Sequence, residues 1–310
     1  MNEFELIAHL TKSLPTNNFV VAGAGDDCAV LDSGQPNRCL LLKTDAVVEG
    51  IHFLPETPAE QIGHKALARC LSDIAAMAGR PIAALVTIAL PKKFDPDFIK
   101  KIYDGMIRLA ERYGVAIVGG ETTTNPERML ISVSLLGDVA KDKCVMRSGA
   151  KAGDAIFVSG ELGGSLTGRH LEFEPRLKEA RWLADNFAIH SMIDLSDGLS
   201  SDLWHILNQS KVGAEIFSKT IPISRAAKLR ARAESSAKPP LLAALSDGED
   251  FELLFTVSSR DAVPLIDGWK KEFGPLKLSC IGKITATPGL KLRDEMGVRN
   301  LQAHGYVHFT

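Results

Sequence analysis

The sequence alternates short apolar runs with longer amphipathic stretches, which restricts the chain to folds that combine strands and helices. Helical spacing predicts helices over Gln61–Ala78 and Asp97–Tyr113, closed by Gly79 and Gly114, and a later helix from about Ser200. The apolar runs are rich in Val, Ile and Leu and are typical of strands; they lie at Cys39–Lys43, Ala83–Leu90, Val115–Val118, Met129–Val139, Ala155–Ser159, Phe251–Val257 and Leu276–Ile284. The sequence therefore predicts an α/β (or α+β) protein.

The chain is long enough for two domains. It has 310 residues, and a polar, Gly-containing passage at Lys141–Asp154 interrupts the regular pattern near its middle. We therefore predict an N-terminal domain over 1–140 and a C-terminal domain over 141–310.

Charge and cysteine content exclude several functional classes. Lysines and arginines number 36 and acidic residues 38, a net charge of −2 that gives no indication of nucleic-acid binding. No apolar stretch approaches the length of a bilayer span, and the N-terminus lacks the organisation of a secretion signal. Five scattered cysteines without a CxxC pair argue against a zinc ribbon or a disulfide framework. These features predict a cytoplasmic protein without a membrane or nucleic-acid partner.

The placement of acidic residues is the most informative functional pattern. Asp73 interrupts the apolar stripe of the first predicted helix, where an isolated carboxylate is costly unless it is protonated, paired or metal-bound. If the apolar runs are strands, further acids lie just beyond strand ends, where open α/β sheets bind ligands. These acids occur in five motifs, at 25–27, 43–45, 119–121, 193–198 and 246–250.

Each of these acids has an ordinary alternative, since an Asp-Gly pair commonly forms a turn. Their number and the scarcity of neighbouring basic residues favour a bound cation, and oxygen-only ligands suit Mg²⁺ or Ca²⁺. Because Mg²⁺ often shares its coordination shell with substrate phosphates, the pattern indicates polyphosphate chemistry. The P-loop, HExxH and GxSxG motifs are absent from the sequence, and Gly23–Cys28 does not complete a dinucleotide fingerprint. The Gly160–Gly164 loop fits either a phosphate cradle or a tight turn.

Eight motifs occur in order and span nearly the whole chain. They are GDDCAV at 25–30, KTDAVVEGIHF at 43–53, HKALARCLSDIAAMAG at 64–79, GGETT at 119–123, MRSGAKAGD at 146–154, IDLSDGLSSDL at 193–203, SDGEDFELLF at 246–255 and GYVHF at 305–309. Together these motifs resemble the thiamine-monophosphate kinase family, which belongs to an ATP-binding superfamily with aminoimidazole ribonucleotide synthetase and selenophosphate synthetase.

The resemblance implies phosphoryl transfer from ATP to thiamine monophosphate, giving thiamine diphosphate in the last step of its biosynthesis. Such transfer needs in-line positioning and charge neutralisation rather than a covalent nucleophile, so we expect no phosphoenzyme. The implied ligands of several Mg²⁺ ions are Asp27, Thr44, Asp45, Asp73, Glu121, Asp194 and Asp197. The implied ATP contacts are Tyr103, Gly120, Glu121, Arg147 and Ser196, and the implied thiamine phosphate contacts are His52, Glu249 and Tyr306.

The resemblance also implies a homodimer. In the family fold, the sheet of the N-terminal α/β domain forms a barrel with its twin from a second copy, and the C-terminal α/β domain packs alongside. If Asp73 converges with Asp27, Asp45 and Asp194, carboxylate repulsion predicts that removing its charge leaves the metal-free protein equally or more stable.

The sequence departs from the family at several positions. Lys43 stands where a small or hydroxyl residue is usual and would place a positive charge beside the metals. Glu121 replaces the usual Asp, Asp247 a usual Gly, and Gly164 a usual Asp, and the segment after Gly168 is shorter than is typical. These departures affect the number of bound metal ions and the affinity for substrate more than they affect the class of reaction.

Two alternatives remain open at this point. One is another synthetase of the same superfamily, although a hydrogenase maturation factor ends in Cys whereas this chain ends in Thr310. The other is a non-catalytic nucleotide-binding dimer, and the five retained aspartates argue against it. These are Asp27, Asp45, Asp73, Asp194 and Asp197.

Overall fold

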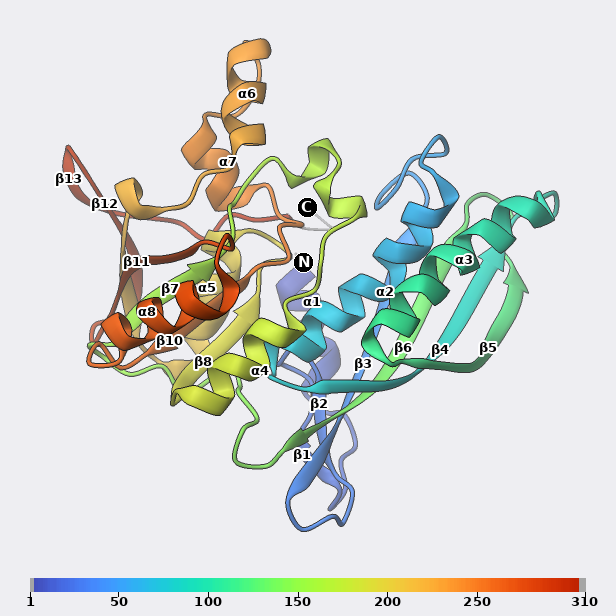
Figure 1. The fold of residues 1–310 in the computed structure, drawn as a ribbon, viewed down its shortest axis with the longest axis horizontal. Coiled ribbons are helices and arrows are strands. Elements are labelled where there is room, and N and C mark those ends of the chain that lie inside the picture. The colour runs from blue at the N-terminus through green and yellow to red at the C-terminus, as the bar shows by residue number, and fades with distance from the viewer. Residues whose placement is uncertain (1–2, 307–310) are drawn as a thin grey trace. The chain divides into compact units, whose positions relative to one another are not determined.

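A computed structural model describes residues 3–306, without the side chain of Phe4, and shows a mixed α/β protein with two sheets. The chain forms two compact units (Figure 1). The six-stranded unit comprises Phe19–Cys144 and Gly168–Leu177, and the seven-stranded unit comprises the described parts of Met1–Asn18, Val145–Thr167 and Lys178–Thr310. The mixed α/β class is confirmed, while the domains over 1–140 and 141–310 stay a prediction. Positions 307–309 of the terminal motif lie outside the described residues.

The sheet of the six-stranded unit is mostly antiparallel. Only β4 and β5 pair in parallel, because α3 carries the chain back across the sheet between them. The spatial order is β1 (Val20–Ala22), β2 (Ala29–Asp32), β3 (Arg38–Val48), β6 (Leu130–Ala140), β4 (Arg80–Leu90) and β5 (Ala116–Thr124).

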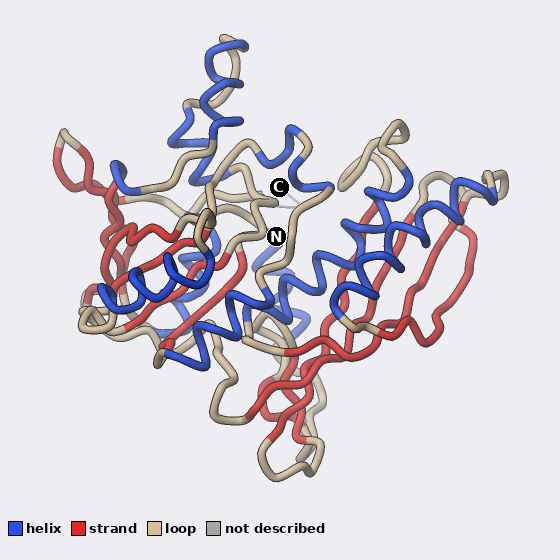
Figure 2. The backbone as a smooth tube through the Cα atoms, in the orientation of Figure 1, coloured by secondary structure: helices blue, strands red, loops and turns tan. Residues whose placement is uncertain are grey.

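The two helices predicted for this region are confirmed as α2 (Ala59–Ala76) and α3 (Pro96–Tyr113). Asp95 caps α3 by accepting the backbone N–H of Asp97, and Gly114 ends it in the left-handed conformation. Figure 2 shows both helices alongside the strands of this unit. Because α2 contacts β3 and β6 as well as α3, it is buried on nearly every side, which explains its apolar composition.

The pleat of β3 decides which of its side chains meet α2. Leu41 and Val47 are buried, so the odd-numbered positions between them, Lys43 and Asp45, share the face that packs against the helix. The even-numbered Leu42 and Thr44 are exposed on the opposite, uncovered face. This face therefore presents both apolar and hydroxyl side chains.

The sheet of the seven-stranded unit is built around the buried strand β7, and the stacked rings of Phe157 and Phe255 lie 5.5 Å apart in its core. Its order is β13 (Gly297–Asn300), β12 (Gly289–Asp294), β9 (Gly213–Phe217), β11 (Leu278–Thr285), β7 (Ala155–Ser159), β10 (Leu253–Val257) and β8 (Ile189–Asp194). The helices of this unit are α1 (Glu3–Thr11), α4 (Leu177–Asn186, mostly within it), α5 (Leu199–Ser210), α6 (Arg225–Ala233), α7 (Pro240–Ser246) and α8 (Ala262–Phe273).

The expectation that the acidic motifs lie just beyond strand ends is wrong for most of them. Asp45 and Glu121 lie inside β3 and β5, because backbone pairing with the neighbouring strands continues through both positions. The motif at 246–250 follows helix α7, whereas Asp27 lies in the loop that follows β1, as expected. Asp194 is the last residue of β8, as expected. In the described chain, no helix is both long and apolar enough to cross a membrane.

Candidate active site

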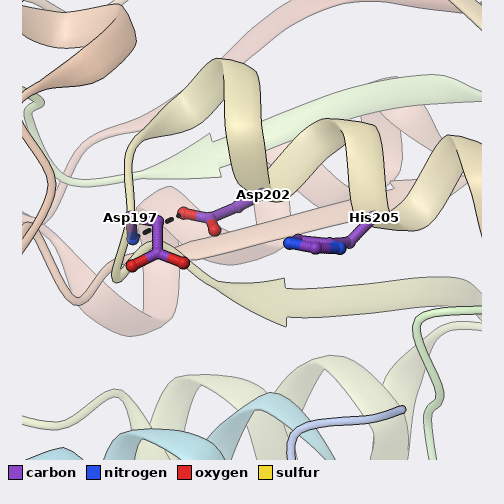
Figure 3. A group of neighbouring side chains, drawn as sticks. All are labelled: Asp197, Asp202 and His205. Atoms are coloured by element: carbon purple, nitrogen blue, oxygen red, sulfur yellow. Dashed lines mark hydrogen bonds between the residues drawn. The ribbon is translucent and has the colours of Figure 1, made fainter. Parts of the chain in front are cut away.

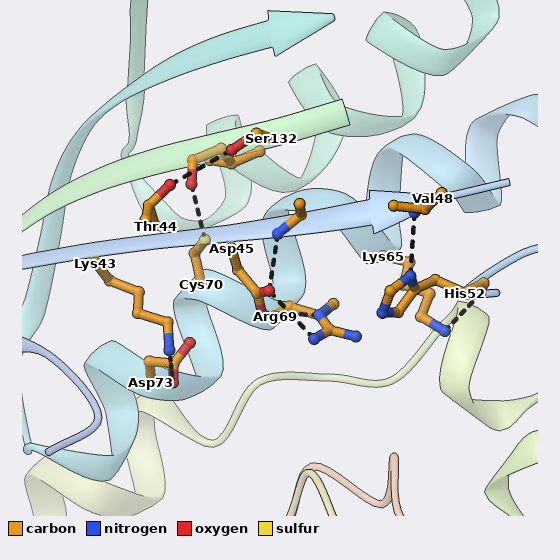
Figure 4. A network of polar contacts seen from close by, with 12 residues as sticks. Lys43, Thr44, Asp45, Val48, His52, Lys65, Arg69, Cys70, Asp73 and Ser132 are labelled. Carbon is orange, nitrogen blue, oxygen red and sulfur yellow. Dashed lines mark hydrogen bonds and ion pairs between the residues drawn. The ribbon is translucent and has the colours of Figure 1, made fainter. Parts of the chain in front are cut away.

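In the six-stranded unit, strand β3 and helix α2 are joined by two ion pairs of opposite polarity (Figure 4). Lys43 Nζ lies 2.7 Å from Asp73 Oδ1, so the strand supplies the cation of this pair. Asp45 accepts two bonds from Arg69, at 2.8 Å from Nε to Oδ2 and 3.2 Å from the terminal nitrogen to Oδ1, so the helix supplies the cation here. Arg69 and Asp73 are four residues apart and share one face of α2. Asp45 of the strand and Asp73 of the helix therefore each contact a cationic side chain of the protein.

These pairs fix the ionisation of the groups involved. Burial by itself raises the pKa of Asp45, but the charges of Arg69 and Lys43 outweigh it and hold that pKa below its ordinary value. Burial lowers the pKa of Lys43, yet the carboxylates of Asp73 and Asp45 outweigh burial and raise that pKa overall. At neutral pH the carboxylate of Asp45 and the ammonium of Lys43 are therefore both charged.

Asp27 belongs to the same neighbourhood. Its side chain is 1% exposed, and one of its carboxylate oxygens lies within 4.8 Å of a carboxylate oxygen of Asp73. The adjacent Cys28 donates its backbone N–H to the sulfur of Met77, and burial raises the pKa of its thiol. Cys28 is therefore a neutral core residue rather than a nucleophile.

Other predicted residues of this unit lie elsewhere. The hydroxyl of Thr44 is 3.2 Å from that of Ser134, on the uncovered face, so its side chain points away from that of Asp45. Glu121 pairs with Thr87 in register, and Gly120 lets β5 approach β4, since a Cβ there would lie 1.7 Å from the carbonyl oxygen of Val86. Tyr103 is half-buried on α3, and burial raises its pKa.

His52 is held in place from two sides. Its Nδ1 accepts the backbone N–H of Val48 at 3.1 Å, so the neutral ring carries its proton on Nε2. Its carbonyl oxygen accepts a bond from the buried ammonium of Lys65 at 2.7 Å, and the same ammonium lies 2.7 Å from Nδ1 of His170. Sequence reasoning missed Lys65; its position on an apolar helix face was the available signal.

In the seven-stranded unit, the loop between β8 and α5 holds most of the predicted residues together. The carbonyl of Ser196 accepts the backbone N–H of Glu249 at 2.7 Å, and the carbonyl of Asp197 accepts that of Tyr306 at 3.0 Å. Glu249 adopts a left-handed φ of 53°, which few residues other than glycine tolerate. The structure thus brings Ser196, Asp197, Glu249 and Tyr306 to one loop that starts at Asp194.

Two further residues of this unit were not predicted. Asp202 and His205 lie one turn apart on α5. One ligand atom of each lies within 4.8 Å of the other and of a carboxylate oxygen of Asp197 (Figure 3). Asp202 also accepts the backbone N–H groups of Gly198 and Asp197, at 3.0 and 3.2 Å. Burial, followed by the nearby carboxylates of Asp197 and Asp194, raises the pKa of Asp202 well above its ordinary value. The i, i+3 spacing on a helix was the signal for this pair.

A cavity of about 510 Å³ in this unit reaches Gly305, the residue before Tyr306 in the chain. Polar side chains of α5 and the chain before Tyr306 line it, including Trp204, His205 and His304. Its volume suits a small organic ligand.

The Gly160–Gly164 loop has backbone donors that are bound by carboxylates, which argues against the phosphate cradle among the alternatives that the sequence left open. The backbone N–H of Gly163 donates to Asp250 at 2.8 Å and that of Gly164 to Asp247 at 3.4 Å, so carboxylates take the donors a phosphate would need. Asp247 also pairs with Arg230 at 2.7 Å and with Lys238 at 3.1 Å. The departures at 164 and 247 are therefore a matched structural contact.

Comparison with known proteins identifies the family. A family model described as AIR synthase related protein, N-terminal domain, matches residues 25–139. Thiamine-monophosphate kinase from Rhodopirellula baltica is 42% identical, with 96% of this chain and 93% of that protein covered. The chain belongs to the thiamine-monophosphate kinase family.

Further members of the thiamine-monophosphate kinase family match over the same extent. The Escherichia coli K12 protein is 36% identical, covering 99% of this chain and 98% of its own length. A solved structure described as AaThiL complexed with AMPPCP and TMP superposes with a TM-score of 0.84 at 30% identity, covering 99% of this chain and 97% of that one. The likeness therefore includes both units rather than one shared domain.

Proposed function

We propose that this protein transfers a phosphoryl group from ATP to thiamine monophosphate, producing thiamine diphosphate and ADP. The observation that supports this most strongly is the end-to-end likeness to AaThiL, whose structure is described with AMPPCP and TMP. The acid-rich loops and strands described above occur at the motifs that carry the family resemblance. Direct in-line transfer fits this chain, since the cysteines beside the acids, Cys28 and Cys70, are buried thiols whose pKa is raised by burial.

Magnesium is the cofactor that the donor chemistry of both units fits. Buried carboxylate oxygens, such as those of Asp27 and Asp73 within 4.8 Å of each other, are ligands that suit Mg²⁺. When bound, Mg²⁺ neutralises phosphate charge and aligns the transferred group. We assign its ligands to Asp27, Asp45 and Asp73 in the six-stranded unit and to Asp194 and Asp197 in the seven-stranded unit. Thr44 and Glu121 are proposed as ligands of a separate ion, because the hydroxyl of Thr44 lies on the face of β3 opposite to Asp45.

The remaining assignments concern the two substrates. Tyr103, Gly120, Glu121, Arg147 and Ser196 contact ATP in this proposal, and His52, Glu249 and Tyr306 contact thiamine monophosphate. The tautomer of His52 supports its role, because an Nε2–H group donates to a phosphate oxygen without requiring a charged ring. Tyr306 is 46% exposed and follows Gly305, which lines the 510 Å³ cavity, and its ring is proposed to stack on a substrate ring.

The proposal is tested by incubating the purified protein with ATP, Mg²⁺ and thiamine monophosphate and measuring thiamine diphosphate by chromatography. We expect conversion of the monophosphate and poor phosphorylation of free thiamine, which lacks the attacking phosphate oxygen. Efficient phosphorylation of thiamine, or no turnover of the monophosphate, would contradict the proposal. ATP consumption with another acceptor would favour a different synthetase, and ATP binding without turnover a non-catalytic dimer.

We also propose a homodimer whose two six-stranded sheets close into a barrel, in a cytoplasmic enzyme. The uncovered sheet face supports this, because Leu42 and Leu85 are 45% and 49% exposed there. The five free cysteines fit a reducing compartment. Sedimentation at micromolar concentration should give a mass of about twice 33.5 kDa. An active species that sediments only as a monomer would contradict the dimer.

A further inference from the structure

We propose that the ammonium group of Lys43 takes the place of one divalent cation beside Asp73, so that this chain binds one Mg²⁺ fewer than its carboxylates could hold. The inference rests on the proposed Mg²⁺ site and concerns its composition. It is carried by a single contact, the 2.7 Å separation of Lys43 Nζ and Asp73 Oδ1.

The position of Lys43 is fixed by the fold. It lies in the middle of β3, paired with Leu135 of β6, on the strand face that packs against α2. The side chain is 24% exposed and that of Asp73 only 9%, so the ammonium group is held among protein groups rather than in open solvent (Figure 4). Asp73 faces this cation from one turn beyond Arg69 on the helix.

The contact leaves little room for a metal ion on that side of Asp73. A divalent ion bound to Asp73 Oδ1 would lie about 2.1 Å from that oxygen. With the ammonium already 2.7 Å from the same oxygen, the two cations would be at most about 4.8 Å apart and would repel each other. Asp27, whose oxygen is within 4.8 Å of an Asp73 oxygen, is the second ligand that such an ion would use. Lysine therefore supplies fixed positive charge in this place.

The test measures metal binding rather than turnover. Calorimetric titration of Mg²⁺ into the protein with a nonhydrolysable ATP analogue gives the number of ions per chain, and Mn²⁺ with electron paramagnetic resonance gives the same number independently. We expect Lys43→Ser to bind one ion more than wild type. Lys43→Gln, whose side chain is closer to lysine in size, should also bind one ion more and replaces the serine variant if that variant does not fold. Lys43→Arg keeps the charge and should bind the same number as wild type.

Two further variants make the result specific. Lys141→Ser removes a lysine from the exposed pair with Asp32, 3.3 Å apart, and should leave the ion count unchanged. Adding Asp73→Asn to the neutral Lys43 variant should abolish the gained ion. An unchanged count in both neutral Lys43 variants, or a gain that persists without Asp73, overturns the inference. The thiamine monophosphate assay is separate, so either proposal can fail without the other.

Discussion

Asp73→Asn should destabilise the metal-free protein by about 2–3 kcal/mol and reduce phosphoryl transfer by about 10²–10³-fold. The stability loss arises because the substitution leaves the ammonium of Lys43, 24% exposed, without the carboxylate 2.7 Å away. Removing one member of a buried ion pair typically costs ~3–5 kcal/mol, and the partial exposure of Lys43 lowers the expected cost to the bottom of that range or slightly below it. Thermal melts in EDTA measure the stability loss, and the thiamine monophosphate assay measures the rate.

A double variant separates the two effects of Asp73→Asn. Adding Lys43→Met removes the uncompensated charge and should restore most of the metal-free stability, whereas activity should stay low because Asp73 is also a proposed ligand. A metal-free melt of Asp73→Asn at or above that of wild type would show that the ion pair contributes nothing. It would also support the expectation from the sequence that carboxylate repulsion makes the metal-free protein equally or more stable once the charge of Asp73 is removed.

Asp202→Asn is the matched comparison, because the same change at an equally buried acid should have the opposite sign. The raised pKa of Asp202 means that the folded protein binds a proton that the unfolded chain, with a pKa of about 3.9, releases. The contribution of Asp202 to wild-type stability therefore falls as pH rises from about 4 towards its folded pKa. An asparagine oxygen still accepts the N–H groups of Gly198 and Asp197 and never has to ionise. In EDTA, Asp202→Asn should match wild type near pH 4 and be more stable at pH 8.

Gly63→Ala and Gly105→Ala should each lower the free energy of unfolding by about 3 kcal/mol or more. The two glycines are the points at which α2 and α3 touch through their backbones. A Cβ at Gly63 would lie 1.8 Å from the carbonyl oxygen of Ile102, and one at Gly105 would lie 2.0 Å from that of Glu60. Because backbone atoms cannot rotate away as a side chain does, the helices must separate. This cost exceeds the ~1 kcal/mol that alanine gains over glycine in a helix.

Denaturant unfolding of the glycine variants, monitored by circular dichroism, measures this effect. Gly23→Ala is the control, since a Cβ there has no neighbour closer than 3.8 Å, and it should unfold with wild type. The double variant should cost less than the sum of the single ones, because either methyl group already separates the same helix pair. Unfolding of Gly63→Ala at the wild-type midpoint would show that the crossing can relax.

Local sequence signals determined where most elements lie. Asp95 and Gly114 mark the ends of α3 because capping and left-handed closure depend only on neighbouring residues. Strand β7 has the predicted bounds, Ala155–Ser159, because a short apolar run between breakers has few alternatives. The same reasoning ended the strand of Cys39–Lys43 too early, because pairing with β6 extends β3 through Thr44 and Asp45 to Val48.

The α/β class, the positions of the two helices and the acidic motifs that carry the family resemblance could all be predicted from the amino-acid sequence. So could the positive charge that Lys43 adds beside these motifs. The packing of α2 against β3 was needed to show that this charge pairs with Asp73, that Arg69 pairs with Asp45, and that Thr44 points to the opposite face. The period of a strand determines which residues share a face. Which of its two faces a helix covers, and which charges lie opposite, depends on contacts between segments far apart in the chain.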